Sequence, residues 1–121
     1  MARYTHVKTT ALGNFPALAL VANSVDLAMT AAVAADKEQT VMSGKDLVIA
    51  HNTGAGARTV TFTSVANGQD KRTGDITTYS IGAGEFAVFG PFEKSGWMQT
   101  DGKLYFEAEH AEVKFGVVAL P

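Results

Sequence analysis

The feature that most constrains the fold is a set of short runs, between residues 46 and 92, in which polar and apolar residues alternate. The clearest is 58–65, R-T-V-T-F-T-S-V, where Val60 and Phe62 alternate with threonines. Successive side chains of a β-strand point to opposite faces, so Val60 and Phe62 are predicted to share one face and the threonines the other. The pattern predicts β-structure with one side of each strand in a core.

Glycine-rich links separate these runs and indicate turns. Residues 46–51, D-L-V-I-A-H, precede 52–57, N-T-G-A-G-A, and no helix survives two glycines so placed. The same order repeats where 75–81 is followed by G-A-G and then by 85–89. Two strand-like runs around a glycine-rich link are typical of a β-hairpin. We therefore expect one hairpin from 46–51 with 58–65 and another from 75–81 with 85–89.

Short strands are expected on both sides of this stretch as well. In order along the chain they are 25–31, 39–42, 96–99, 103–107 and 112–120. Asp101-Gly102 is a strong turn signal between the third and the fourth of them. In the last one Val113, Phe115 and Val117 fall on one face. These runs bring the expected total to eight or nine strands.

One segment permits two interpretations. Residues 29–35 are rich in alanine, which is the best helix former. We favour a strand over 25–31 and a loop or a single helical turn before Asp36. A helix over 28–38 is the alternative.

Strand number and spacing predict an all-β fold in a single domain. A chain of 121 residues buries roughly 65% of the surface that its unfolded form exposes, which is enough for a core that needs no disulfides or bound metal ions. Many short strands between turn signals favour an antiparallel β-sandwich or a jelly-roll or barrel-like fold. We place this domain at 17–121 and expect 1–16 to be an extended N-terminal arm.

Composition excludes several classes of partner. The net charge of −2 leaves no electrostatic footprint for nucleic acid, and the chain has no cysteine for disulfides or thiolate metal sites. The start has no apolar signal region, and the apolar tract 17–22 is too short to cross a bilayer. We expect a protein that is made in a cytoplasm and has no membrane partner.

Catalytic and metal-binding patterns are missing from the sequence. His6, His51 and His110 do not stand at the spacing of metal ligands, and no Gly-x-Ser-x-Gly elbow presents a serine. The loops at 54–58 and 82–85 lack the Lys-Ser/Thr ending of a P-loop. We expect no enzyme, no cofactor and no metal.

The acidic residues near the C-terminus are interpreted as a solvated face. Glu107 and Glu109 stand two apart in a predicted strand, where they can pair with Lys103 or Lys114 across the sheet. Glu112 belongs to the same acidic group. Nothing near them suggests the cleft that paired catalytic carboxylates need.

Two polar segments are the candidates for contacts with a partner. The N-terminal arm has a local positive balance, and the loop 67–74 is the longest polar loop of the chain. A frayed end and a merely solvated loop are the alternatives. The candidate partner-binding residues are Arg3, Tyr4, His6, Lys8, Asp70, Lys71 and Arg72.

Several runs of the chain resemble small virion proteins of tailed bacteriophages, of the capsid decoration or head cement type. The runs are RTVTFTSV at 58–65, GDITTYSIGAGEF at 74–86, FGPF at 89–92, GWMQTDGKLY at 96–105 and VKFGVV at 113–118. The resemblance extends over residues 17–120. It implies a small β domain on the capsid surface that binds assembled major capsid protein, often as a trimer of itself, and stiffens the shell. It implies no small-molecule substrate, and no family site residues map onto this chain.

Such a protein needs a rigid scaffold and an arm or edge that engages neighbours, and strand addition by an extended terminus is a recurring way to do so. We expect the arm, residues 2–15, to order on the capsid or on an adjacent copy. Another virion part, such as a head–tail connector, a tail-tube protein or a head-fibre base, is the alternative. A carbohydrate-binding module that uses Trp97 and Tyr105 is a third, and it requires both rings to be exposed and coplanar.

Overall fold

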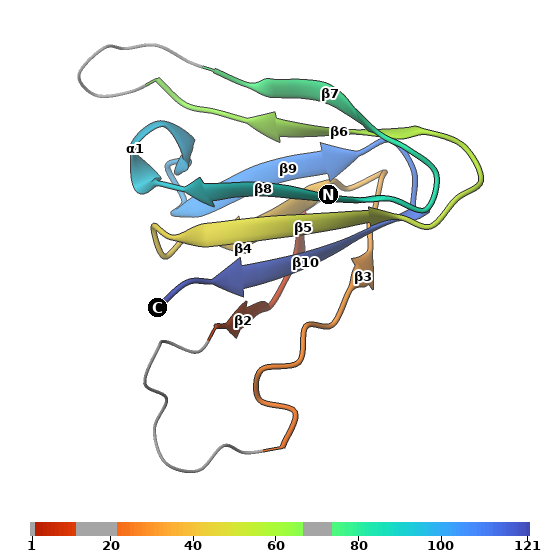
Figure 1. Ribbon diagram of the computed structural model, residues 1–121. Coiled ribbons are helices and arrows are strands. Elements are labelled where there is room, and N and C mark those ends of the chain that lie inside the picture. The colour runs from red at the N-terminus through yellow and green to blue at the C-terminus, as the bar shows by residue number, and fades with distance from the viewer. Residues whose placement is uncertain (1, 12–21, 67–73) are drawn as a thin grey trace.

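The protein is an all-β sandwich, shown in Figure 1. A computed structural model describes residues 2–11, 22–66 and 74–121, of which 49% lie in strands and 4% in helix. The elements in chain order are β1 Tyr4–Thr5, β2 Lys8–Thr10, β3 Thr30–Ala31, β4 Glu38–Val41, β5 Asp46–Asn52, β6 Arg58–Thr63, β7 Ile76–Ile81, β8 Phe86–Phe92, α1 Lys94–Trp97, β9 Lys103–Ala108 and β10 Val113–Ala119.

The strands form two five-stranded sheets. Sheet A has the order β1-β4-β9-β6-β7, and sheet B has the order β2-β10-β5-β8 with β3 also paired to β10. Without the two N-terminal strands, β3-β10-β5-β8 faces β4-β9-β6-β7, which is the strand order of a jelly roll. Figure 1 shows β8, β5 and β10 running side by side in sheet B.

Aromatic side chains from both sheets fill the space between them. Phe62 of sheet A lies 4.6 Å from Phe89 and 5.1 Å from Phe92 of sheet B, measured between ring centroids. Phe106 of sheet A meets Phe115 of sheet B edge to face at 4.9 Å. Burying one phenylalanine side chain stabilises a fold by about 2–3 kcal/mol, so these rings supply much of the force that joins the sheets.

The alternation of the sequence identifies the buried faces correctly. Val60 and Phe62 are buried, with 1% and 0% of their surface exposed. Val113, Phe115 and Val117 are buried together on β10, as their spacing predicts. The threonines of β6 point away from the core, because they hold the intervening positions.

The two predicted hairpins are wrong, although their strands exist. β5 pairs with β8 and β10 in sheet B, whereas β6 pairs with β7 and β9 in sheet A. β7 and β8 likewise belong to different sheets. Packed sheets stand about 10 Å apart, a distance that the glycine-rich links can span. Each link therefore crosses from one sheet to the other. The apolar face of each strand is then buried against the apolar faces of the opposite sheet.

Two other segments differ from the expected elements. Only Thr30–Ala31 of the expected strand 25–31 is β-structure, and the alternative helix over 28–38 does not form. The expected single turn forms at 34–36, where the backbone N–H of Lys37 donates to the Val33 carbonyl oxygen at 2.8 Å. The helical turn α1 covers the first two residues of the expected strand 96–99, and the other two are not in a strand. The Asp-Gly turn after them forms, with Gly102 at a φ of 81°.

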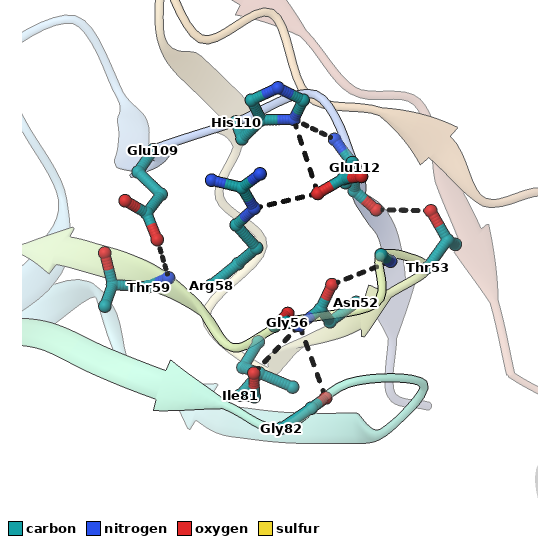
Figure 2. A network of polar contacts seen from close by, with 11 residues as sticks. Asn52, Thr53, Gly56, Arg58, Thr59, Ile81, Gly82, Glu109, His110 and Glu112 are labelled. Carbon is teal, nitrogen blue, oxygen red and sulfur yellow. Dashed lines mark hydrogen bonds and ion pairs between the residues drawn. The ribbon is translucent and has the colours of Figure 1, made fainter.

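Asn52, at the end of β5, ties two of the crossing links together, as Figure 2 shows. Its side chain is fully buried. Its Nδ2 donates to the carbonyl oxygens of Gly56 at 2.8 Å and Ile81 at 2.9 Å, with Gly82 at 3.3 Å. Its Oδ1 accepts the backbone N–H of Gly54 at 2.9 Å. One amide therefore satisfies backbone groups of the β5–β6 link and of the β7–β8 link.

Replacing Asn52 with alanine is expected to destabilise the whole sandwich. The change leaves carbonyls of both links without a donor, and unsatisfied buried groups lower the free energy of unfolding, here by about 3 kcal/mol. Urea denaturation followed by the fluorescence of Trp97 measures this. The control Thr53→Ala removes one exposed hydrogen bond, to the Glu112 carbonyl oxygen at 2.7 Å, and costs about 0.5 kcal/mol. Equal losses in the two variants contradict the role of Asn52.

Candidate functional site

The outer faces of the two sheets differ in chemistry. Sheet A presents polar side chains, from the threonines of β6 and from alternate positions of β9. Sheet B presents a mainly apolar set, which we call the apolar face. Its members are Leu47, Ile49 and His51 of β5, Phe86 and Val88 of β8, and Val118 of β10, and the exposed, charged Lys114 of β10 stands beside His51.

Strand register brings these side chains into contact range. Val88 stands opposite Ile49, and Phe86 opposite His51. The rings of His51 and Phe86 stack with centroids 3.9 Å apart and planes 6° from parallel. Phe86 and Val88 nevertheless remain 61% and 64% exposed. His51 is thus a structural part of an apolar surface.

The segment before β3 covers one end of this face. A Cβ at Gly116 of β10 would lie 2.6 Å from the Met29 sulfur and 2.9 Å from the Leu27 Cδ1, so the two side chains rest directly on this glycine. Only glycine permits such close packing on the outside of β10. Leu27 and Met29 therefore cover the β10 side of the apolar face, whereas Phe86 and Val88 on its β8 side stay exposed.

β8 is also the edge of its sheet. Within the described residues, sheet A ends in β7 and sheet B ends in β8, so two consecutive strands form edges. Neither strand contains a charged residue. Natural edge strands are usually protected from pairing by charges, prolines or bulges. Pro91 protects the end of β8, and residues 86–89 have no such protection.

The predicted contact residues of the N-terminal arm have partners within their own chain. Arg3 donates to the carbonyl oxygens of Glu38 at 3.0 Å and Phe106 at 3.3 Å. The Nζ of Lys8 donates to Asp46 Oδ1 at 2.8 Å. β1 pairs in parallel with β4, and β2 in parallel with β10. The expectation that the arm needs a second surface for its order is therefore wrong for residues 2–11.

His6 is the most deeply placed member of that set. It is 4% exposed and lies between Phe106 of sheet A and Phe115 of sheet B, with ring centroids 5.5 Å and 5.7 Å away. Its Nε2 stands 3.5 Å from Glu38 Oε1. Neither His6 Nε2 nor Glu38 Oε2 has a hydrogen-bond partner. Of the four N-terminal candidates, only Tyr4 is exposed, at 40%.

The other predicted contact residues, Asp70, Lys71 and Arg72, lie outside the described residues. So does the expected boundary between the arm and the domain at residue 16.

The acidic residues near the C-terminus are engaged in contacts other than the expected ones. Glu107 lies 3.6 Å from the Nζ of Lys37, and neither Lys103 nor Lys114 is its partner. Figure 2 shows Glu109 accepting the backbone N–H of Thr59 at 2.9 Å. In the same view Glu112 accepts from Arg58 Nε at 2.8 Å. These carboxylates fasten loops at one end of the sandwich.

The described residues contain no group of three or more His, Cys, Asp or Glu side chains that is placed to hold a metal ion. No helix among them has the length and apolar character needed to cross a membrane.

The rings of the carbohydrate interpretation do not form a platform. Trp97 packs against the core and meets Phe92 edge to face at 4.8 Å. The face of Tyr105 is covered by the Arg3 guanidinium at 4.0 Å, and its hydroxyl donates to Asp101 Oδ2 at 2.6 Å. The geometry therefore disfavours stacking of a sugar on these two rings.

Sequence reasoning missed the buried polar residues. Glu38, Asp46 and Asn52 are each fully buried at inward positions of their strands. Asp46 and Asn52 stand at the two ends of β5, next to turn residues. A polar residue at an inward position of a strand end is the available signal, because such a residue can bond to the adjoining turn.

A comparison of the chain with models of known protein families finds no match. Comparisons with curated proteins and with solved structures find none either.

Replacing Asp46 with asparagine should change how stability depends on pH. Burial alone would raise the pKa of Asp46, but hydrogen bonds from Lys8 and from Ser43 outweigh it and hold the pKa below its ordinary value. The carboxylate therefore stabilises the fold above the unfolded pKa of about 3.9, and this is lost as pH falls through the folded value.

The difference in unfolding free energy between wild type and Asp46→Asn is expected to be largest near about pH 6 and to shrink below about pH 4. Urea denaturation at a series of pH values measures it. Asp26→Asn, at an exposed turn, serves as the control. A difference that stays constant down to the acid range contradicts the role of the Asp46 carboxylate.

Proposed function

We propose that this chain is a capsid decoration protein of a tailed bacteriophage. In this role it binds the exterior of the assembled major capsid protein and stabilises the head. The observation that carries the proposal is the apolar face with its exposed Phe86 and Val88 beside an unprotected strand edge. The resemblance of the sequence to small virion proteins supplies the partner.

The apolar face suits binding between proteins. Contiguous apolar surface is rare on soluble monomers and marks contact sites when it occurs. Phe86 and Val88 lie side by side with Ile49 and His51 behind them, so one surface offers both an aromatic anchor and aliphatic contacts. Aromatic side chains are enriched at the centres of interfaces.

The adjoining edge offers a second means of binding. The outer backbone groups of residues 86–89 on β8 have no neighbouring strand among the described residues. An extended peptide from another chain can add to such an edge through main-chain hydrogen bonds. Side chains on the apolar face then select the partner, while the rigid sandwich holds both features in a fixed relation.

Electron microscopy of purified particles tests the virion role. A decoration protein occupies symmetry-related positions on the capsid exterior in hundreds of copies, whereas a connector occurs in about a dozen. Density for this chain at the head–tail junction or along the tail supports the alternative virion roles. Its absence from particles overturns the proposal. The oligomeric state in solution, a trimer by the resemblance, is measured separately.

The double substitution Phe86→Ser and Val88→Thr is expected to weaken capsid binding at least about tenfold. It removes apolar surface that binding would bury, and a tenfold loss corresponds to about 1.4 kcal/mol. Co-sedimentation with capsids lacking the protein measures the affinity. The matched control is Val41→Thr, because Val41 is 54% exposed on sheet A.

Both proteins are expected to keep the wild-type unfolding transition, since these side chains point away from the core. Equal capsid affinities for the double variant and the control would show that the apolar face is not the docking surface.

A further inference from the structure

The N-terminal segment, residues 2–11, adds to the sandwich in the way that a bound peptide does. β1 lies parallel to β4, with Tyr4 opposite Glu38, and β2 lies parallel to β10, with Lys8 opposite Val117. The segment therefore passes from the edge of sheet A to the edge of sheet B. We call the surface that receives it, formed by β4, β10 and the start of β5, the slot.

Backbone hydrogen bonds fix the segment in the slot. The N–H of Tyr4 donates to Lys37 and that of His6 to Gln39, both at 2.9 Å. The N–H of Ala11 donates to the Ala119 carbonyl oxygen at 2.8 Å. The hydroxyl of Thr40 adds a bond to the His6 carbonyl oxygen at 3.1 Å. These contacts define one register for an extended chain.

The charges of the segment and of the slot are complementary. Arg3, His6 and Lys8 are the basic side chains of residues 2–11. His6 lies next to the Glu38 carboxylate and Lys8 bonds to the Asp46 carboxylate, and both acids are fully buried. Arg3 takes two carbonyl oxygens at the rim. Each buried carboxylate of the slot therefore has a basic side chain of the segment beside it.

None of these contacts depends on the segment belonging to the same chain. The receiving groups lie at positions 37–46 and 106–119, and a second copy presents the same groups in the same arrangement. Exchange of an identical element between copies keeps every contact and is a recurring route to assembly. The slot fits the pattern Arg-x-x-His-x-Lys in one register, and this chain itself supplies that pattern.

We propose that the slot also receives the N-terminal segment of a second copy, so that two copies bind each other by exchanging residues 2–11. Exchange replaces an intramolecular contact with an intermolecular one, and it is favoured where copies are held at high local concentration. The inference does not depend on the proposed virion role, because the segment and the slot are both parts of this chain.

Charge reversal on separate copies tests the exchange. Lys8→Glu places two acids together in its own slot, and Asp46→Lys places two lysines together in its own slot. When the two variants are mixed, each segment fits the slot of the other copy. We expect native mass spectrometry of the mixture to show a heterodimer at least tenfold more abundant than either homodimer. The double variant Lys8→Glu/Asp46→Lys restores opposite charges at positions 8 and 46 within one chain. Because a lysine at 46 cannot accept the bonds that Ser43 donates to Asp46, this variant is also the control for folding.

A mixture that contains no heterodimer, while the double variant is folded, overturns the proposal. If either single variant is unfolded alone, the near-ultraviolet circular dichroism of the mixture, which reports packed aromatic side chains, still tests the exchange. Its recovery on mixing supports exchange, and its failure to recover counts against it. A synthetic peptide of residues 2–11 is expected to block heterodimer formation, and a scrambled peptide of the same composition is not. Equal blocking by the two peptides overturns the proposal, because the slot would then accept any basic strand.

A second measurement leaves the charges unchanged. The chain has no cysteine, so Thr9→Cys on one copy and Val118→Cys on another report their pairing without interference. These two positions are register partners between β2 and β10. Exchange predicts a disulfide between copies under mild oxidation. Thr77→Cys on β7 replaces Val118→Cys as the control for random collision, and equal yields of linked dimer in both mixtures contradict exchange.

Discussion

The side chain of Asn52 is the interaction on which the arrangement of the sheets most depends. Jelly-roll strands alternate between two sheets, so the links that cross between them carry backbone groups away from any ladder. Asn52 bonds to the β5–β6 link and to the β7–β8 link at once. Asp46, at the other end of β5, accepts from the Ser43 turn and from Lys8. β5 therefore has an apolar middle and a buried polar side chain at each end.

The sequence predicts the faces of the strands but not their partners. Alternation with a period of two requires Val60 and Phe62 to share a side, and this holds in any sheet that the strand joins. Which strand lies beside it depends on how the apolar faces of all the strands pack against one another in the whole fold. β6 pairs with β9, which lies some forty residues further along the chain. A glycine-rich link is compatible with a hairpin and with a crossing of the sandwich, so local pattern could not distinguish the two.

The site was predictable only in part, for a related reason. The basic residues of the N-terminus were predicted to contact a partner, but Arg3 and Lys8 bind groups of their own chain, which only the tertiary arrangement reveals. Phe86 and Val88 belong to a run in which both faces of the strand are apolar. Periodicity cannot say which of its two faces meets the core, and so the exposed apolar face was not foreseen.

The two sides of the sandwich end in strands of opposite character. On one side the edges are β1 in sheet A and β2 with β3 in sheet B. β1 and β2 are two and three residues long and are flanked by basic residues with buried acidic or carbonyl partners. On the other side the edges are β7 and β8, which are longer and uncharged, and β8 carries exposed apolar side chains. Short, charged edges resist further strand pairing, whereas long, neutral ones accept it. The proposed contact through β8 and the proposed exchange of residues 2–11 therefore use different edges of the sandwich.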